Sequence, residues 1–123
     1  MSQERLKKIL VVDDEVDVCD LMKVFLESSG YVAMTANRAM EALNIVELEK
    51  PDVVLQDVVM PDMDGLECLK RIKKAHPETI VIVVSGLQDE GVAKEAIRYG
   101  AYDYITKPFD LTYLKDSILG RIF

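Results

Sequence analysis

Five short apolar runs, separated by stretches with helical periodicity, constrain the fold of this chain more than any other feature of its sequence. The runs are rich in β-branched and aromatic residues, as strands are; they cover residues 9–12, 31–34, 53–55, 80–84 and 101–105. After each run, apolar residues recur every three or four positions, which predicts an amphipathic helix; these helices cover residues 18–25, 39–46, 66–72, 92–97 and 111–118. The pattern therefore predicts five alternating strand–helix units.

Alternation of strands and helices predicts a parallel sheet with helices on both faces, because each right-handed crossover must cover the sheet. The first, third and fourth runs are uninterrupted aliphatic segments, as strands buried on both faces require. The second run has Thr35 just past its end and the fifth contains Asp103, so we expect both at the edges. This favours the strand order 2-1-3-4-5 over 3-2-1-4-5, which would place the third strand at an edge. The expected fold is α/β, a doubly wound parallel five-stranded sheet of the flavodoxin-like type.

Residues that begin and end helices agree with this periodicity. Asn37, Asp89 and Asp110 can cap helix starts. Gly30 and Gly100 lie where a left-handed residue would end a helix. The helix boundaries therefore fall between the predicted strands.

Five other residues receive a structural interpretation. Asp62 and Asp64 are interpreted as turn and cap residues, and His76, the only histidine, as a solvated residue at a helix end. Cys19 and Cys68 are far apart and form no Cys-x-x-Cys motif, so we interpret them as reduced cysteines on helices.

Length and charge limit the class of protein. The chain has 123 residues, with 15 Lys and Arg against 22 Asp and Glu, which fits one domain over residues 1–123. Its net charge of −7 argues against direct nucleic-acid binding, which needs a basic patch. The apolar run at residues 9–12 is too short for a signal peptide or a membrane span, so we expect a cytoplasmic protein without membrane contact.

Polar residues gather where the predicted strands end. In an open parallel sheet, ligands bind outside the carboxyl ends of the strands. The residues there are Asp13-Asp14-Glu15, Gln56-Asp57, Ser85-Gly86 and Thr106-Lys107-Pro108. Carboxylates in one crevice repel each other, and a divalent cation would relieve that repulsion. Hard oxygen ligands with room for water and phosphate suit Mg²⁺.

These groups fit phosphoryl transfer. An aspartate can attack phosphorus, Lys107 can place a point charge on a phosphoryl oxygen, and Ser85 can donate a hydroxyl proton. Each residue also has an ordinary explanation: the acids after residue 12 suit a helix N-terminus, and Lys107 could be a solvated surface charge. The coincidence of four separate segments at one end of the sheet favours a functional site.

These segments, in this order and spacing, resemble the receiver domains of bacterial two-component response regulators. The matching motifs extend over essentially the whole chain; they are Val11-Val12-Asp13-Asp14-Glu15, Asp57-Val58-Val59-Met60-Pro61-Asp62-Met63-Asp64-Gly65, Val84-Ser85-Gly86 and Lys107-Pro108-Phe109. The resemblance implies a signalling switch rather than a metabolic enzyme. It also implies two kinds of partner, a sensor histidine kinase or phosphotransfer protein and a downstream effector or output domain.

The resemblance assigns roles to the site residues. Asp57 would accept phosphate from a phosphohistidine of the partner kinase, and the domain would slowly hydrolyse the resulting phosphoaspartate. Asp14 and Asp57 would bind Mg²⁺ directly, with the backbone carbonyl of Val59 as a third ligand and Asp13 acting through water. Ser85 and Lys107 would contact the phosphoryl group.

The resemblance also implies a conformational switch. Tyr104 would turn inward as Ser85 moves toward the phosphoryl oxygen, although packing of Tyr104 on an edge strand is an equally good explanation of that residue. The change would alter the face made by the fourth helix, the fifth strand and the fifth helix, through which a phosphorylation-dependent dimer could form. The family's Lys-Pro bond, here Lys107–Pro108, is usually cis.

The sequence departs from the commonest receiver pattern at a few positions. Ser85 stands for the more frequent Thr and Gly86 for the more frequent Ala. Val59 and Leu87 would flank the path of a hydrolytic water, and both are apolar. We therefore expect a long-lived phosphoaspartate, and a Val59→Asn, Leu87→Glu double variant should lose its phosphate faster in a dephosphorylation time course.

Three other classes share part of this pattern. A phosphatase of the haloacid dehalogenase type would need Asp-x-Asp and a cap, whereas this chain has Asp13-Asp14 and no residues for a cap. A flavodoxin-like nucleotide or flavin binder would have Gly, Ser or Thr in its first loop rather than acids. A receiver that works without phosphorylation would be expected to lack Asp57 or Lys107, and both are present.

Overall fold

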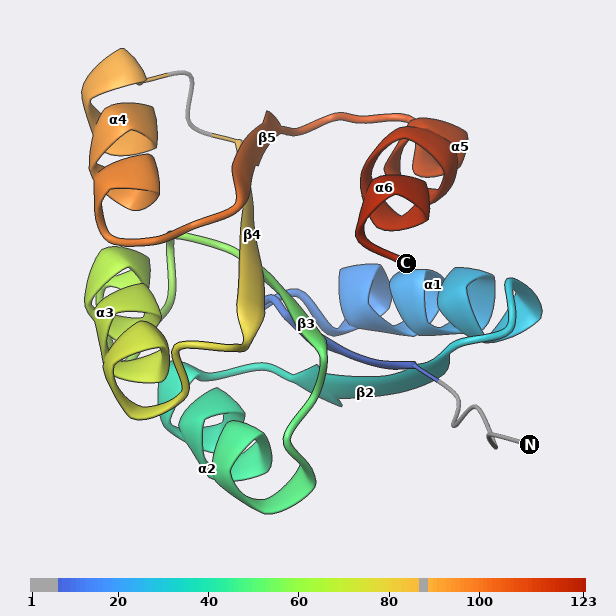
Figure 1. Cartoon of the computed structure of the whole chain (residues 1–123), viewed down its shortest axis with the longest axis horizontal. Helices are drawn as coiled ribbons and strands as arrows, with labels where there is room; N and C mark the ends of the chain where they lie inside the picture. Colours follow the sequence, from blue (N-terminus) through green and yellow to red (C-terminus); the bar gives the residue numbers. More distant parts are fainter. Residues whose placement is uncertain (1–6, 87–88) are drawn as a thin grey trace.

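The computed structural model describes residues 7–86 and 89–123, and its centre is one parallel sheet (Figure 1). The strands are β1 (Lys8–Val12), β2 (Val32–Ala36), β3 (Val53–Gln56), β4 (Ile80–Ser85) and β5 (Asp103–Thr106). Their order in the sheet is β2-β1-β3-β4-β5, and all four pairings are parallel. The predicted fold class and strand order are therefore confirmed.

A helix follows each strand. The first four are α1 (Val16–Ser28), α2 (Ala39–Glu49), α3 (Gly65–Ala75) and α4 (Glu90–Arg98). The last helical stretch comprises α5 (Leu111–Tyr113), a π-helical segment (Leu114–Leu119) and α6 (Gly120–Ile122). Among the described residues, no helix combines the length and the apolar character that crossing a membrane requires.

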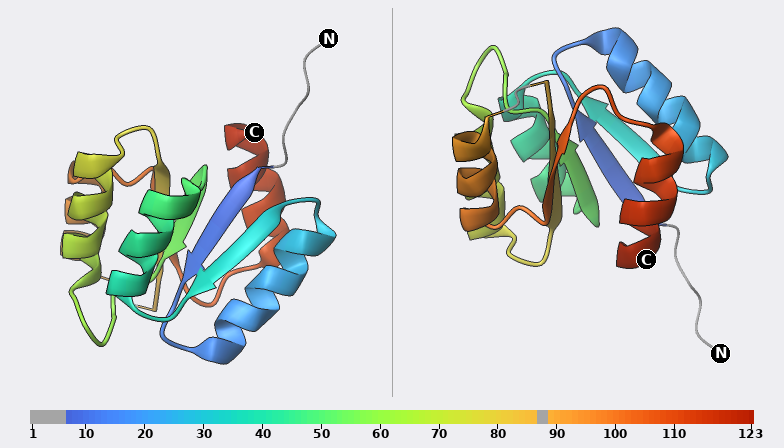
Figure 2. Two further views of the ribbon diagram at one scale, coloured as in Figure 1. Left: turned by 90° about the horizontal axis from the view of Figure 1, so that it is seen from below. Right: turned by 90° about the horizontal axis from the view of Figure 1, so that it is seen from above.

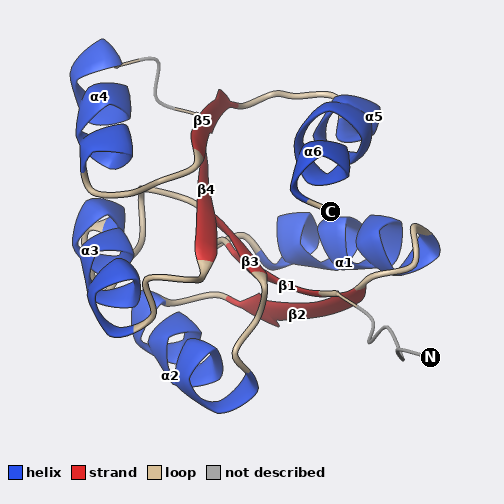
Figure 3. Ribbon diagram, in the orientation of Figure 1, coloured by secondary structure: helices blue, strands red, loops and turns tan. Residues whose placement is uncertain are grey.

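The helices form two layers, one on each side of the sheet, as Figures 2 and 3 show. Helices α2, α3 and α4 cover one face, while α1 and the last helical stretch cover the other. Alternate strand residues point to opposite faces, so each face has its own apolar core; Leu10 and Val54 belong to one core, and Ile9 and Leu55 to the other. This sandwich leaves the strand ends free to carry polar side chains.

The edge strands begin later than their apolar runs predict. Tyr31 lies before β2 because its N–H donates to the carbonyl of Leu26 at 3.1 Å and thereby closes the end of α1. The N–H of Ala101 closes the end of α4 in the same way, through a 2.9 Å bond to Ala96. Gly30 and Gly100 have φ of 94° and 105°, which confirms that they end these helices in the left-handed region.

Helix capping agrees with the sequence at three starts and differs at one. The side chains of Asp64, Asp89 and Asp110 accept backbone N–H groups at the starts of α3, α4 and α5, as predicted. The prediction for Asn37 is wrong, because Arg38 immediately precedes α2 and makes no side-chain cap bond.

The carboxylate of Asp62, in the loop between β3 and α3, caps α2 in place of Asn37. The two oxygens of Asp62 accept the N–H groups of Ala39 and Met40 at 2.9 and 3.0 Å, so the β3–α3 loop caps α2. Asn37 instead donates its amide to the carbonyl of Asp13 at 3.0 Å. Helix α2 is thereby tied to the two loops that carry the acids.

The Asp62 cap makes the attachment of α2 sensitive to acid. The N–H groups of Met40 and Ala39 hold the pKa of Asp62 below its ordinary value. Because the folded-state pKa is the lower one, the stabilisation is present above an unfolded-state pKa of about 4 and is lost as pH falls through the folded-state value. We expect Asp62→Ala to lower the urea midpoint at neutral pH. The difference in urea midpoint between the variant and the wild type should become smaller in acid. An Asp20→Ala variant, at an exposed residue of α1, should show no such pH-dependent gap.

The prediction of a solvated His76 is also wrong. Its side chain is 14% exposed, and its Nε2 lies 2.7 Å from Glu47 Oε2 on α2, while Nδ1 lies 3.7 Å from Glu78 Oε1. His76 therefore links the ends of α2 and α3 on the side of the molecule away from the acids.

Candidate functional site

Two neighbouring strand ends place the acids. The N–H of Asp13 donates to Ala36 at 3.0 Å and that of Asp57 donates to Val12 at 3.0 Å, so both residues continue the strand hydrogen bonding for one step. Asp13 and Asp57 are almost buried, at 4% and 8% exposed, whereas Asp14 is exposed. The sheet thus fixes the backbone of two buried acids and leaves the side chain of the third open to solvent.

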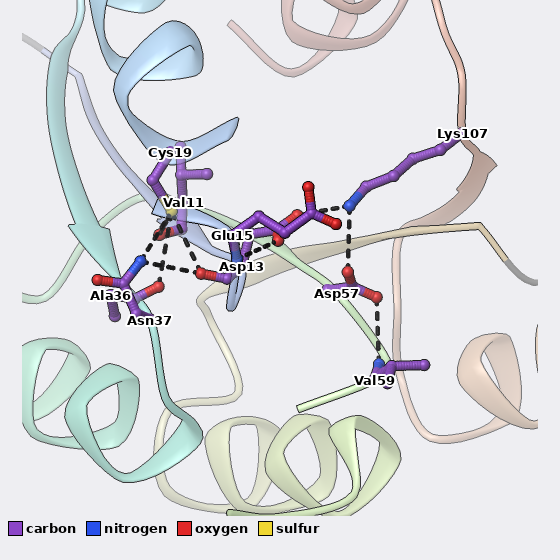
Figure 4. Close-up of polar contacts among 9 residues, drawn as sticks. All are labelled: Val11, Asp13, Glu15, Cys19, Ala36, Asn37, Asp57, Val59 and Lys107. Atoms are coloured by element: carbon purple, nitrogen blue, oxygen red, sulfur yellow. Dashed lines mark hydrogen bonds and ion pairs between the residues drawn. The ribbon is translucent and has the colours of Figure 1, made fainter. Parts of the chain in front are cut away.

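Backbone N–H groups orient the two buried carboxylates. Asp13 Oδ1 accepts the N–H of Glu15 at 2.9 Å, and Asp57 Oδ1 accepts the N–H of Val59 at 3.1 Å (Figure 4). Each carboxylate keeps its second oxygen for other partners. Both side chains are therefore held by their own loops before any ligand arrives.

Asp13, Asp14 and Asp57 form one cluster. Each contributes a carboxylate oxygen, and these oxygens lie within 4.8 Å of one another. Three carboxylates this close repel each other unless a cation lies between them. The donor set consists of hard oxygens, part buried and part open to water, which fits Mg²⁺ better than a metal that prefers nitrogen or sulfur ligands.

Lys107 reaches the cluster from the end of β5 (Figure 4). Its Nζ lies 2.5 Å from Asp13 Oδ2 and 3.1 Å from Asp57 Oδ2. Partial burial alone would lower the pKa of Lys107, but the hydrogen bonds and charges of Asp13 and Asp57 outweigh it and raise that pKa above its ordinary value. The lysine is therefore a fixed positive charge that neutralises part of the acidic cluster.

An open pocket of about 240 Å³ is lined by most of the predicted site residues. Its walls include Asp14, Asp57, Val59, Ser85 and Lys107, with Glu15 and Gly86 completing them. The carbonyl of Ser85 accepts the N–H of Lys107 at 2.7 Å, which joins the ends of β4 and β5. Val59 is 56% exposed at the rim, whereas Leu87 lies outside the described residues.

Tyr104 lies apart from this pocket. Its half-buried ring packs against the core on the α2–α4 face. It lines a separate hollow of about 380 Å³ together with Asp89, Glu90, Ala93 and Thr106. The structure therefore brings together the predicted metal ligands, Ser85 and Lys107, but not Tyr104. The Lys107–Pro108 peptide bond is cis, as the family resemblance implies.

Both cysteines are buried near this end of the fold and should be unreactive. Burial and the charge of Asp13 raise the pKa of Cys19 to about 11. Burial, with a smaller effect of Asp62, raises that of Cys68 to about 12. Because the thiolate is the reactive form, we expect neither to react with a thiol reagent at pH 8 in the native protein and both to react in urea. Rapid labelling of native protein would contradict this expectation.

Four residues that shape the site had no such role assigned from the sequence. Asn37 and Asp62 act across the chain, and neither position has a local pattern that reveals its partner. Gln56 and Gly65 did carry a signal: an amide at the end of an aliphatic strand, and a glycine at the start of a helix. Gln56 donates a hydrogen bond to Gly65, and Gly65 lies against the start of the loop that follows Asp57.

Known proteins are similar to this chain in sequence. The sequence model of a family described as response regulator receiver domain matches residues 9–119. Chemotaxis protein CheY of Thermotoga maritima is 38% identical over 113 residues, covering 91% of this chain and 94% of that protein. The regulatory protein AtoC of Escherichia coli is 38% identical over 109 residues, but those residues are only 24% of its length and 89% of this chain.

Solved structures agree with the sequence comparison. A CheY-like response regulator receiver domain protein from Methanospirillum hungatei has a TM-score of 0.92 and 34% identity, over 96% of this chain and 94% of its own. A chain of the CheX-CheY-BeF3-Mg complex from Borrelia burgdorferi has a TM-score of 0.88 and 28% identity, over 95% of this chain and 90% of its own. The sheet order, the clustered acids and these matches lead to one assignment: the chain belongs to the family of response regulator receiver domains.

Proposed function

We propose that this receiver domain is a switch in which Asp57 accepts a phosphoryl group from the phosphohistidine of a sensor histidine kinase or phosphotransfer protein. One observation carries the proposal: Asp57 lies in an open pocket, with Lys107 and two further carboxylates around it. Phosphoryl transfer depends mainly on positioning and charge neutralisation, and this pocket offers both.

The metal site would be made of oxygen atoms from two loops. Asp14, Asp57 and the backbone carbonyl of Val59 would hold Mg²⁺, and Asp13 would act through a bound water. When bound, the ion would neutralise charge that develops on the phosphoryl oxygens. The clustering of the three carboxylates and the hard character of their oxygens support this assignment, as does the Mg²⁺ named for the similar Borrelia burgdorferi complex.

The transfer step uses groups already in place. A carboxylate oxygen of Asp57 would form a bond to phosphorus as the P–N bond of the phosphohistidine breaks, with its electron pair passing to the imidazole nitrogen. The Nζ of Lys107 lies 3.1 Å from Asp57 Oδ2. It would exchange this contact for one with a negatively charged phosphoryl oxygen once the phosphoryl group is bound. The hydroxyl of Ser85 would donate a hydrogen bond to another. Slow attack of water on phosphorus would later release phosphate and restore the aspartate.

The output would arise at a different face. As Ser85 moves toward the phosphoryl group, Tyr104 would turn from its place over the α2–α4 core and change the surface made by α4, β5 and the last helical stretch. That surface would then bind an effector or output domain, or a second phosphorylated copy. We place this signalling in the cytoplasm and assign no direct nucleic-acid contact to this acidic chain.

Intact mass and peptide mapping after treatment with acetyl phosphate test the proposal. With Mg²⁺, the wild type should gain one phosphoryl group, mapped to the peptide that contains Asp57, and the gain should disappear without Mg²⁺ and in Asp57→Asn. An unmodified wild type would indicate a receiver that works without phosphorylation. Turnover of added phosphomonoesters would indicate a phosphatase instead.

A further inference from the structure

Gln56 is a buried amide at the end of β3, directly before Asp57. It is 1% exposed, and its neighbours in the sheet are Val12 and Val83. The other three residues of β3 are aliphatic and buried. A polar side chain in such a position must be satisfied by hydrogen bonds or it costs stability.

Only half of this amide is satisfied within the described residues. Gln56 Nε2 donates to the carbonyl of Gly65 at 2.6 Å, across the whole β3–α3 loop. Gln56 Oε1 is buried and has no hydrogen-bond partner among the described residues. An unpaired buried acceptor costs about 1–3 kcal/mol, so an apolar side chain of similar size would serve stability at least as well.

Gln56 and Gly65 together close the base of the loop that carries Asp57 and Val59. The N–H of Gly65 donates to the carbonyl of Val58 at 2.8 Å, while its own carbonyl accepts from Gln56. A Cβ atom on Gly65 would lie 2.6 Å from the carbonyl oxygen of Asp57, so only a glycine lets the helix start approach the backbone of the acid this closely. A shift of Gly65 toward this backbone would therefore displace the loop that carries the carboxylate of Asp57 and the carbonyl of Val59.

We infer that Gln56 is a positioning residue for phosphoryl transfer: its amide locks the β3–α3 loop so that Asp57 and the Val59 carbonyl stay in place for metal and phosphoryl group. The inference rests on the proposed function for its kinetic consequence, but the lock itself is a property of the metal-free chain. It explains why the core keeps a side chain that is only half paired.

Gln56→Met tests the lock, because it removes the amide and keeps the length of the side chain. We expect hydrogen exchange at the Gly65 amide to accelerate about tenfold while the urea midpoint stays the same or rises. Titration with Mg²⁺ alone by calorimetry should show about tenfold weaker binding, as is typical when a residue behind a ligand is removed. The initial rate of phosphorylation by acetyl phosphate should fall even at saturating Mg²⁺.

Val54→Ala is the matched control, since Val54 lies on the same strand and the same face and is fully buried. It should lower the urea midpoint and leave Mg²⁺ affinity unchanged. Unaltered exchange at Gly65 and unaltered Mg²⁺ affinity in Gln56→Met would overturn the inference, as would an equal loss of Mg²⁺ affinity in Val54→Ala. If the wild type itself is not phosphorylated, the proposed function fails, while the exchange measurement still decides whether the lock exists.

Discussion

Gly65→Ala should destabilise the protein by about 3 kcal/mol, at the upper end of the cost of overpacking. The new Cβ would lie 2.4 Å from Val58 Cα, 2.5 Å from Val58 O and 2.6 Å from Asp57 O. All three are backbone atoms just past the end of the central strand β3, so the clash can be relieved only by moving the loop that holds Asp57 or the start of α3. Urea unfolding followed by circular dichroism measures the loss, and calorimetry should show weaker Mg²⁺ binding in the same variant.

Gly120→Ala provides the control, because Gly120 is also the first residue of a helical segment. Its added Cβ would meet Lys115 O at 3.5 Å, an ordinary contact. Alanine favours helix by up to about 1 kcal/mol over glycine, so this variant should be as stable as the wild type or more so. Equal urea midpoints for the two variants would show that the loop after Asp57 yields more easily than its contacts indicate.

The strand order was predictable because burial leaves a clear mark on composition. Strands covered on both faces must be aliphatic, and β1, β3 and β4 are, apart from their end residues. The starts of β2 and β5 were missed because the amides of Tyr31 and Ala101 close helices instead, and the apolar runs do not show which partner an amide takes.

The candidate site was predictable where its residues follow strand ends, and not where they act between loops. Asp13, Asp57 and Lys107 follow strand ends, and the parallel sheet alone brings strand ends together. Asn37, Asp62 and Gln56 act through contacts between loops, whose course depends on the packed structure. The sequence therefore predicts the charged groups of the site and misses the polar side chains that hold their loops.

Lys107→Met should change three properties in different directions. Phosphorylation of Asp57 by acetyl phosphate should fall about 100-fold, the usual cost of removing a group that stabilises charge in a transition state. Mg²⁺ should bind about tenfold more tightly, since a competing cation near the carboxylates is removed. The metal-free protein should lose about 2 kcal/mol, because Asp13, at 4% exposed, would be left without its counter-charge.

Lys94→Met removes the same charge from an exposed position of α4 and is the control for net charge. It should leave the phosphorylation rate, Mg²⁺ affinity and stability in a chelator close to those of the wild type. The opposed signs make the test specific: a variant that merely unfolds would lose Mg²⁺ affinity together with activity. If Lys107→Met bound Mg²⁺ more weakly than the wild type, the lysine would not compete with the metal, and its contacts with Asp13 and Asp57 would instead serve to hold the two carboxylates in position.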